Sequence, residues 1–253
     1  MTREFEGRVA LVTGGASGIG RTSAIAFACK GAKVVVNDLD AKGGTETIKI
    51  INGNGGEAIF YEADVGESSD VEALIKTTTD TYGRLDFAHN NAGFEGVFAS
   101  TSDYPEEIWN RVIKTNLKGV WLSMKYEIPQ MLRCGGGSIV NTASTAGLVG
   151  FPQTIAYVAS KHGIVGMTRS IALEYAGSGI RVNAVCPGGV NTPMKDRIIA
   201  MSPDLTQAAG NRSALGRSAE PEEIAQAVVW LCSQAASFIT GHPLIIDGGY
   251  LAQ

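Results

Sequence analysis

The sequence predicts an α/β fold in which a doubly wound, parallel, seven-stranded sheet is flanked by helices. Short apolar runs, typical of buried strands, alternate with longer amphipathic stretches from one end of the chain to the other. Each amphipathic stretch is long enough to cross back over a sheet, so we expect consecutive strands to run parallel. Because no repeat or linker interrupts the pattern, we expect residues 1–253 to form a single domain.

Seven apolar runs are the expected strands: Val9–Val12, Lys33–Asn37, Ala58–Glu62, Leu85–His89, Ser138–Thr142, Arg181–Val185 and Leu244–Ile246. The expected helices lie between them, at residues 19–30, 41–51, 68–82, 105–132, 153–176 and 220–233. Pro105 and Pro221 each fit the first turn of a helix, where the acidic pair that follows complements the helix dipole. Residues 187–218 contain several Gly and Pro residues and no periodic pattern, so we expect a variable functional loop there.

The composition excludes several classes of protein. Hydrophobic residues make up 44% of the chain and the formal net charge is −4, which argues against disorder and against a nucleic-acid partner. The long uncharged stretches 134–160 and 224–246 are interrupted by Gly, Pro and polar residues, so we expect no membrane span. The N-terminal residues lack the apolar segment of a secretory signal, so we expect a cytoplasmic protein.

The cysteines carry no metal-binding pattern. The chain has four, at widely separated positions, and none of them forms a Cys-x-x-Cys pair or a Cys/His cluster. We therefore expect no metal site and four buried thiols in a reducing compartment.

Glycine is over-represented, with 32 residues where average usage would give about 18. The first cluster, Thr13-Gly14-Gly15-Ala16-Ser17-Gly18-Ile19-Gly20, follows the first expected strand and opens the first expected helix. A pyrophosphate that receives N–H groups from a helix N-terminus must approach the backbone closely, and Cβ atoms would obstruct it. The same spacing also occurs in ordinary tight turns, so the residues that follow decide between the two interpretations.

The second expected strand leads to Asp38, about 20 residues after the glycine turn, where dinucleotide-binding folds place the carboxylate that binds the adenosine ribose. A 2′-phosphate would meet Asp38 as a like charge, and neither Ser17 nor Leu39 supplies a neutralising base. The sequence therefore favours NAD over NADP. Two alternatives stay open: Asp38 as a turn residue, and Arg21 in the first helical turn as a phosphate ligand.

Tyr157 and Lys161 are four residues apart in an expected helix and so share one face. An unperturbed tyrosine has a pKa near 10, and a nearby cation would lower it, so Tyr157 is a candidate general base. Such a pair also arises as a lysine lying beside a surface tyrosine, which makes its neighbours important.

Two further polar residues fit the same chemistry. Ser144 directly follows an expected strand, where the carboxyl ends of parallel strands form a binding crevice, so its hydroxyl is placed to polarise a carbonyl. Asn116 lies among apolar residues of a long expected helix and needs a partner for its amide. A purely structural buried amide is the alternative interpretation of Asn116.

Taken with these residues, the chain resembles the short-chain dehydrogenase/reductase family over essentially its whole length. The resemblance is carried by Thr13-Gly14-x-x-x-Gly18-x-Gly20, Asp64, Asn90-Asn91-Ala92-Gly93, Asn116, Ser144, Tyr157-x-x-x-Lys161 and Pro187-Gly188-x-Val190-x-Thr192, all in family order. It implies a Rossmann fold and a catalytic tetrad of Asn116, Ser144, Tyr157 and Lys161. Tyr157 would be the general base, Ser144 would orient the substrate, Lys161 would also bind the nicotinamide ribose, and Asn116 would anchor a proton-relay water.

The resemblance also outlines an NAD site in which Asp64 and Val65 meet the adenine, and Val190 and Thr192 hold the carboxamide. The cofactor-binding residues that we expect are Gly14, Ser17, Gly18, Ile19, Gly20, Asp38, Leu39, Asp64, Val65, Asn91, Ala92, Gly93, Tyr157, Lys161, Pro187, Gly188, Val190 and Thr192.

Family position also suggests a substrate pocket and an assembly. The expected pocket residues, which are mainly apolar, are Phe94, Glu95, Ser144, Leu148, Phe151 and Met194. Small residues in the helix around Ala156, Ala159, Ser160, Gly163 and Gly166 allow close approach of a second helix, and relatives pair through such helices, so a homotetramer is expected.

The predicted function is reversible hydride transfer between a small secondary alcohol, cyclic or aliphatic and fairly apolar, and NAD. Within enzymes, the alternatives are a 3-oxoacyl-thioester reductase and a sugar (glucose-type) dehydrogenase of the same family. The alternative outside enzymes is an NAD-binding regulator on the same fold.

Overall fold

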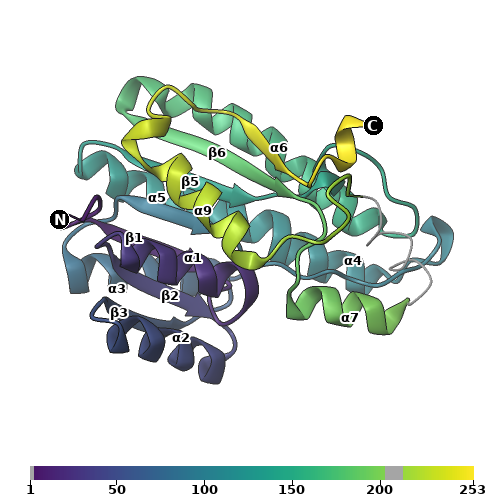
Figure 1. Ribbon diagram of the computed structural model, residues 1–253, viewed down its shortest axis with the longest axis horizontal. Coiled ribbons are helices and arrows are strands. Elements are labelled where there is room, and N and C mark those ends of the chain that lie inside the picture. Colours follow the sequence, from purple (N-terminus) through teal and green to yellow (C-terminus); the bar gives the residue numbers. More distant parts are fainter. Residues whose placement is uncertain (1–2, 203–212) are drawn as a thin grey trace.

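A computed structural model describes residues 3–202 and 213–253, and within them seven parallel strands form one sheet. Figure 1 shows the sheet with helices packed around it. The strand order is β3-β2-β1-β4-β5-β6-β7. The strands are β1 (Val9–Thr13), β2 (Lys33–Asp38), β3 (Glu57–Glu62), β4 (Phe87–Asn90), β5 (Gly137–Thr142), β6 (Ile180–Pro187) and β7 (Pro243–Ile246). The predicted parallel, seven-stranded Rossmann-type sheet is confirmed.

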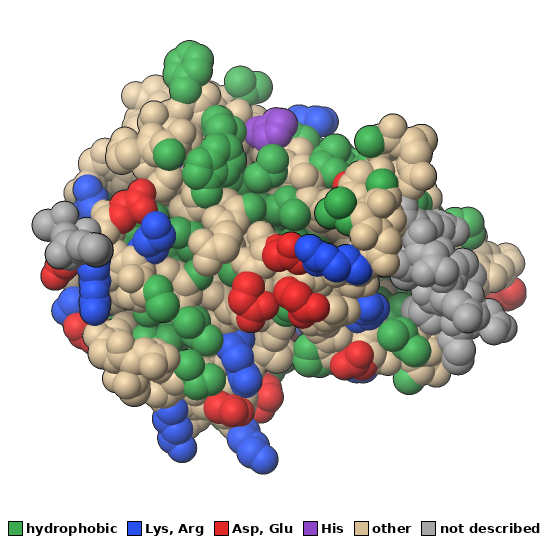
Figure 2. Space-filling view, in the orientation of Figure 1, with side chains coloured by type: hydrophobic (Ala, Val, Ile, Leu, Met, Phe, Trp, Pro, Cys, Tyr) green, Lys and Arg blue, Asp and Glu red, His purple; other side chains and the backbone are tan. Residues whose placement is uncertain are grey.

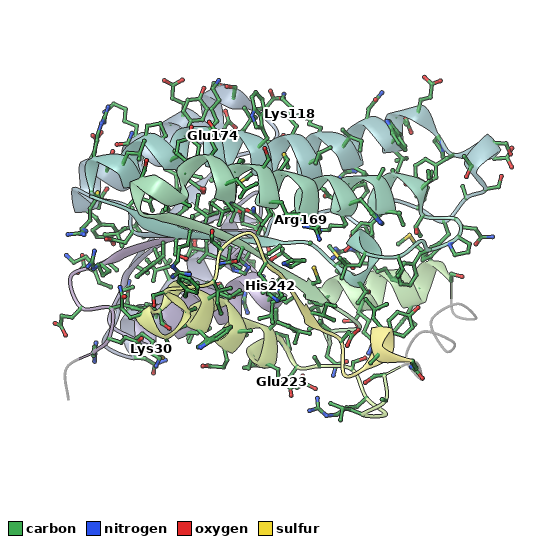
Figure 3. All side chains as sticks on the ribbon, turned by 90° about the horizontal axis from the view of Figure 1, so that it is seen from above. Lys30, Lys118, Arg169, Glu174, Glu223 and His242 are labelled. Atoms are coloured by element: carbon green, nitrogen blue, oxygen red, sulfur yellow. The ribbon has the colours of Figure 1, made fainter. Side chains whose placement is uncertain are left out.

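Helices cover both faces of this sheet. They are α1 (Gly18–Cys29), α2 (Ala41–Gly53), α3 (Ser68–Tyr82), α4 (Glu106–Val112), α5 (Gly119–Arg133), α6 (Ile155–Tyr175), α7 (Pro193–Met201) and α9 (Pro221–Cys232). In the view of Figure 3, Lys118 and Glu174 lie in the layer of α5 and α6, whereas Lys30 and Glu223 lie in the layer of α1 and α9. The sheet therefore has an apolar core on each side.

Alternating strand residues fill the two cores. In β1, Ala10 and Val12 pack into the cluster under α1, α2 and α9, whereas Leu11 packs into the cluster under α3, α5 and α6. Strand residues that face either core are buried, which explains why the strands appear in the sequence as unbroken apolar runs.

The order of the strands reverses between β1 and β4, which lie side by side in the sheet. From β1 the chain winds outward to β2 and β3, and from β4 it winds the other way to β7. The loops that leave β1 and β4 therefore diverge and open a crevice at the carboxyl ends of the strands. The glycine turn follows β1 and the Asn91–Gly93 turn follows β4, so both lie at this crevice.

Two helical predictions need correction. The sequence predicts one regular helix over 105–132, but a π-helical segment, η2 (Ile113–Lys118), separates α4 from α5. Residues 187–218 have no periodic apolar pattern, yet Pro193–Met201 forms α7. Pro193 occupies the first turn, and the Thr192 side chain caps the helix by accepting a hydrogen bond from the backbone N–H of Lys195. Residues 203–212 of the expected loop lie outside the described residues.

The prediction of four buried thiols is wrong for two of them, because Cys29 is exposed and Cys134 is half-buried, while Cys186 and Cys232 are buried. Of the helices in the described parts of the chain, none has the length and apolar character needed to cross a membrane.

Candidate active site

A cavity of about 920 Å³ opens at the carboxyl ends of β1, β2, β4, β5 and β6. This volume lies at the upper end of the range typical of small-molecule and cofactor sites. The predicted residues among its lining are Gly14, Ser17, Gly18, Ile19, Asp38, Leu39, Asp64, Val65, Glu95, Asn91, Ala92, Gly93, Ser144, Phe151, Tyr157, Lys161, Pro187, Gly188, Val190, Thr192 and Met194. Residues from almost every part of the chain therefore meet in one place.

The glycine turn forms one end of the cavity. Gly14 and Gly18 both have positive φ, of 65° and 50°. A Cβ on Gly20 would lie 2.0 Å from the carbonyl oxygen of Gly14, so this position belongs to the tight packing of the turn and not to the cavity lining. The turn thus brings its backbone to the cavity without side chains in the way.

The N-terminus of α1 faces this turn with its amide groups available. Ser17 is the N-cap residue, and its side chain makes no capping hydrogen bond to the described residues. The first turn of α1 contains no acid that would occupy the positive end of the helix. These are the features by which a helix N-terminus binds a phosphate group, so the site fits the pyrophosphate of a dinucleotide.

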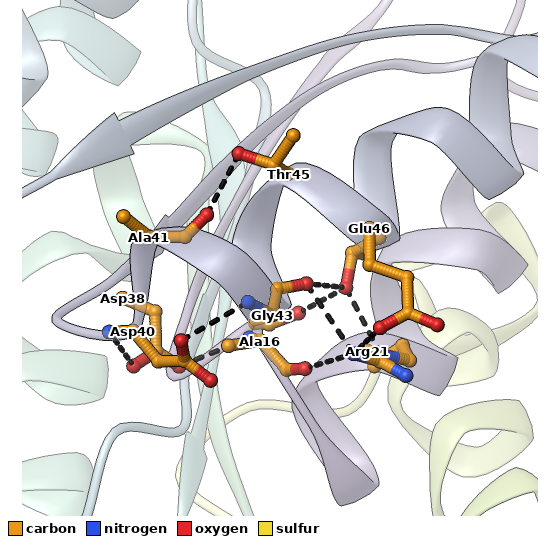
Figure 4. Close-up of polar contacts among 10 residues, drawn as sticks. Ala16, Arg21, Asp38, Asp40, Ala41, Gly43, Thr45 and Glu46 are labelled. Atoms are coloured by element: carbon orange, nitrogen blue, oxygen red, sulfur yellow. Dashed lines mark hydrogen bonds and ion pairs between the residues drawn. The ribbon is translucent and has the colours of Figure 1, made fainter.

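Asp38, at the end of β2, is held beside the turn by two backbone groups, as Figure 4 shows. Its Oδ2 accepts from the N–H of Ala16 at 2.9 Å, and its Oδ1 accepts from the N–H of Asp40 at 3.0 Å. Each carboxylate oxygen has a second lone pair, so both remain able to accept a hydroxyl. The side chain is therefore fixed in place as a double acceptor.

Arg21 is engaged elsewhere. Its guanidinium donates to the carbonyl oxygens of Ala16 and Gly43 and to Oγ1 of Thr47, and it lies 3.5 Å from Glu46. These contacts tie α1 to α2. The arginine that the sequence left open as a phosphate ligand is thus a structural link between the two helices.

The segment after β3 forms the far end of the cavity, where Asp64 and Val65 line it. Lys114, from η2, donates to Oδ2 of Asp64 at 3.0 Å and pairs with Glu67 at 2.6 Å. Burial acts to raise the pKa of Asp64, but the N–H of Gly66 and the Lys114 ammonium outweigh it, so the pKa is lowered. Sequence reasoning missed Lys114, whose partner is far away in the chain.

Asn91 joins the two loops that flank the crevice. Its amide donates to the carbonyl oxygens of Thr13 and Gly14, and its Oδ1 accepts from Oγ1 of Thr142. The same Thr142 hydroxyl contacts Nε2 of the buried His89 at 2.9 Å. The glycine turn, β4 and β5 are therefore fixed to one another by side-chain hydrogen bonds.

Ser144, Tyr157 and Lys161 converge on the other half of the cavity. Ser144 follows β5, and Tyr157 and Lys161 lie one turn apart in α6. Lys161 is 3% exposed, and its Nζ donates to the carbonyl oxygen of Thr142 at 2.7 Å and lies 5.4 Å from the centre of the Tyr157 ring. The predicted grouping of a serine, a tyrosine and a lysine is present.

The predicted direction of the Tyr157 pKa shift is wrong. Burial of the phenol raises its pKa to about 12; a hydrogen bond with Ser144 opposes this shift and the charge of Glu95 adds to it. Burial also lowers the pKa of Lys161 to about 8. The Lys161 ammonium donates to the carbonyl oxygen of Thr142 and not to the phenol, so burial sets the direction of the Tyr157 pKa shift.

Asn116 lies beneath the cavity and does not line it. Its Oδ1 accepts from the N–H of Phe94 at 2.8 Å, and its Nδ2 donates to the carbonyl oxygen of Phe94 at 2.9 Å and to Oγ of Ser160 at 3.3 Å. The amide thus holds both polar groups of one residue in the segment after β4.

The segment after β6 covers the glycine turn. A Cβ on Gly188 would lie 3.0 Å from Asp247, and a Cβ on Gly18 would lie 3.1 Å from Cγ2 of Thr192. Val190 forms an isolated bridge with Ala219. This segment therefore approaches the turn closely enough to enclose a ligand between them.

The substrate end of the cavity differs from the prediction in two residues. Phe94 does not line the cavity described here, because its ring lies 4.2 Å from the guanidinium of Arg111, and Leu148 packs against the core under α6. Tyr250, from the C-terminal turn, lines it instead, with its ring 6.3 Å from that of Phe151. Further lining residues of this end include Phe98, Gln153, Arg197, Ile198 and Met201.

Comparison with known proteins decides the family. A family model described as enoyl-(acyl carrier protein) reductase matches residues 14–251. The cyclohexanol dehydrogenase of Acinetobacter sp. (strain SE19) is 41% identical over 258 residues, which cover 100% of this chain and 98% of that protein. The chain belongs to the short-chain dehydrogenase/reductase family.

Other members of the family support the same placement. The 2,5-dichloro-2,5-cyclohexadiene-1,4-diol dehydrogenase of Sphingobium indicum (strain B90A) is 41% identical over 250 residues, covering 98% of this chain and 99% of that protein. The crystal structure of levodione reductase superposes with a TM-score of 0.93 at 36% identity, covering 98% of this chain and 99% of that one. This short-chain dehydrogenase/reductase is thus an oxidoreductase whose fold implies a nicotinamide cofactor.

Proposed function

We propose that this short-chain dehydrogenase/reductase oxidises a secondary alcohol with NAD and reduces the corresponding ketone in the reverse direction. The observation that carries the proposal is the convergence of Ser144, Tyr157 and Lys161 in the same cavity as the glycine turn and Asp38. When bound, NAD would accept the hydride from the carbinol carbon and, in its oxidised form, bring a positive charge. The residues of the chain would bind and align the alcohol and move its proton.

Tyr157 is the proposed general base for the hydroxyl proton of the alcohol. In the described structure burial holds its pKa at about 12, so it needs a positive charge beside it to deprotonate near neutral pH. Lys161 supports this role because its ammonium lies on the same face of α6 and is removed from water. The Ser144 hydroxyl donates to the phenol oxygen of Tyr157, so it is placed to orient the substrate oxygen between the two hydroxyls.

The position of Asp38 favours the binding of NAD over the binding of NADP. Its carboxylate is fixed by Ala16 and Asp40 with lone pairs left for ribose hydroxyls, and a 2′-phosphate would meet a negative charge there. Arg21 is held by α2 and does not offset this charge. The same argument speaks against an NADPH-dependent 3-oxoacyl-thioester reductase.

The proposed substrate is a compact ring alcohol. Phe98, Phe151, Met194 and Ile198 supply mostly apolar lining to the substrate end of the cavity, which suits a carbocycle better than a sugar with its many hydroxyls. The names of the two relatives, a cyclohexanol dehydrogenase and a cyclohexadiene-diol dehydrogenase, point the same way.

The test measures the turnover of cyclohexanol, with NAD and with NADP, in the wild type and in Tyr157→Phe. The change in nicotinamide absorbance reports the turnover. Removal of the phenolic hydroxyl should lower kcat by about 10²–10⁴-fold, the usual contribution of general acid–base catalysis. NAD affinity, measured by calorimetry, should stay within about threefold, because the ring and its packing remain. A variant that turns over like the wild type would refute the mechanism, and a chain that binds NAD without oxidising any ring alcohol would favour the regulator.

We also propose that the chain assembles as a homotetramer. Of the small residues that the sequence suggested, Ala156 and Ser160 are buried inside the subunit and a Cβ on Gly163 would lie 2.6 Å from Leu117 of the same chain, whereas Gly166 is exposed and a Cβ there would meet open space. Large exposed apolar side chains lie in the same helix, at Leu173, and on other elements, at Trp121, Trp230, Phe238 and Ile245. Figure 2 shows hydrophobic side chains on the face over α9 and the segment that leads to β7. Sedimentation should give a tetramer, and a stable monomer at micromolar concentration would refute the proposal.

A further inference from the structure

Glu95 is a buried carboxylate at the substrate end of the cavity. It is 8% exposed and lines the cavity that Ser144 and Tyr157 also line. Its backbone follows Phe94, whose N–H and carbonyl are both held by Asn116, so the position of Glu95 is set by a rigid segment. A carboxylate is rarely buried without a reason, because its removal from water is costly.

Arg197, in α7, is the charged partner of Glu95. Its Nε and Nη2 donate to the two carboxylate oxygens, the second at 3.0 Å, in the side-by-side geometry of a bidentate pair. The Glu95 side chain is 6% exposed and the Arg197 side chain 56% exposed, so the arginine reaches in from the protein surface. The pair joins the segment after β4 to α7 across 102 residues of sequence.

The pair leaves Glu95 able to accept further hydrogen bonds. A carboxylate offers about four lone-pair sites, and the guanidinium uses one on each oxygen. A donor inside the cavity can therefore bind to either oxygen without displacing Arg197. Apolar side chains such as Phe98, Phe151 and Ile198 supply no such donor.

Glu95 does not assist the proton transfer. Its negative charge raises the pKa of Tyr157, which makes the phenolate harder to form. The other acids that line the described part of the cavity lie elsewhere or are occupied. Asp38, Asp40 and Asp64 lie at the adenosine end, Glu223 pairs with Arg217, and Asp247 accepts from two backbone N–H groups. Glu95 raises the pKa of the proposed base, Tyr157, and yet forms part of the cavity lining. Contact with the substrate explains its position best.

We propose that Glu95 is a specificity-determining residue that accepts a hydrogen bond from a second hydroxyl on the substrate ring. The preferred substrates are then ring diols and ring hydroxyketones, in which one oxygen meets Ser144 and Tyr157 and another meets Glu95. A mono-alcohol leaves the buried acceptor without a donor, and sites that bind a hydroxyl discriminate strongly against analogues that lack it. The inference rests on the proposed ring-alcohol dehydrogenase function and names its substrate class.

The experiment compares kcat/KM for cyclohexanol with kcat/KM for the 1,2-, 1,3- and 1,4-cyclohexanediols, with NAD at saturation. The wild type should favour at least one diol by about tenfold or more, as expected for a hydrogen bond to a charged group. In Glu95→Leu, which removes the acceptor, that ratio should fall about tenfold or more while NAD affinity stays within about threefold. Asp80→Asn, which breaks the Lys76–Asp80 surface pair of α3, is the matched control and should leave the ratio unchanged.

A second variant covers the case in which Glu95→Leu does not fold. Arg197→Gln keeps the carboxylate and removes its charged partner, so the diol preference should persist while both kcat/KM values fall. In Glu95→Gln, loss of the negative charge should move the rising limb of the kcat–pH profile to lower pH, since that charge raises the pKa of Tyr157. A purely structural ion pair would leave the ratio of kcat/KM for the diols to that for cyclohexanol unchanged in every Glu95 variant that folds, whereas the shift of this limb tests only the effect of the Glu95 charge on Tyr157.

The two hypotheses fail in different ways. A wild type that oxidises neither cyclohexanol nor any diol refutes the proposed function, and the inference falls with it. A wild type that oxidises cyclohexanol and all three diols equally well, or a folded Glu95→Leu variant with an unchanged ratio, overturns the inference alone.

Discussion

Replacement of Asp38 by alanine should reverse the cofactor preference of the enzyme. In the structure Asp38 accepts from Ala16 and Asp40 and keeps a lone pair on each oxygen for the ribose. A hydrogen bond to a charged group contributes about 1.5–3 kcal/mol, so the loss of one such bond, taken as about 2 kcal/mol, lowers kcat/KM for NAD by about 30-fold.

The same substitution removes a repulsion from NADP. A carboxylate and a phosphate about 5 Å apart, at an effective dielectric of about 40, repel by roughly 1.5 kcal/mol per unit charge. Relief of this repulsion raises kcat/KM for NADP by about tenfold. Together the two effects change the NAD/NADP ratio by about 300-fold.

The assay is the ratio of kcat/KM for NAD to that for NADP with cyclohexanol as substrate, at two ionic strengths. The repulsive part should weaken as salt is raised, because the site is open to solvent. Asp40→Asn is the control: Asp40 lies two residues away, and asparagine can still cap α2 through the N–H of Gly43. If Asp38→Ala leaves the ratio within a factor of three, or Asp40→Asn shifts it equally, the assignment of Asp38 to the ribose is refuted.

Two further predictions concern buried polar groups. Asn116→Ala should leave the N–H and the carbonyl of Phe94 without their partner and lower the free energy of unfolding by about 2–4 kcal/mol, which chemical denaturation measures; a change below 0.5 kcal/mol would contradict it. Burial raises the pKa of Glu127 to about 8, and an Asn90 hydrogen bond opposes this shift. Because the folded chain then binds the proton more tightly than the unfolded chain, the free energy of unfolding should fall as pH rises from about 4.5 to 8, by up to about 5 kcal/mol. Glu127→Gln should flatten this dependence of the melting temperature on pH, and an equally steep profile in the variant would rule Glu127 out as its source.

The strands could be predicted closely because both faces of a parallel sheet are buried. Every described strand begins and ends within two residues of its predicted range. The helix boundaries near α7 and η2 were harder for a local reason. α7 is nine residues long and has no buried residue, so it presents no apolar stripe. The π-helical segment changes the hydrogen-bond pattern from i+4 to i+5 without interrupting the apolar residues, and periodicity does not report such a change.

The cofactor half of the site was more predictable than the substrate half. Gly14, Gly18 and Asp38 act through the backbone or at the end of a strand, so their positions follow from the order of the elements. The substrate wall depends on side-chain direction in irregular segments. Phe94 turns toward Arg111, whereas Glu95, the next residue, lies at the cavity and meets Arg197, and no local pattern in the sequence encodes either contact.

Asn116 holds the segment that carries the substrate wall. An amide in the middle of a helix normally has few local acceptors, because the helical carbonyls and N–H groups bind one another. Here Asn116 lies in the π-helical segment and is fully buried, and its Oδ1 and Nδ2 reach out of the helix to both polar groups of Phe94. The side chain fixes the peptide geometry just before Glu95, so the carboxylate meets Arg197 without a flexible loop beneath it. Asn116, for which the family resemblance implies an anchored relay water, thus holds the segment that carries Glu95, and loss of its amide should alter substrate preference as well as turnover.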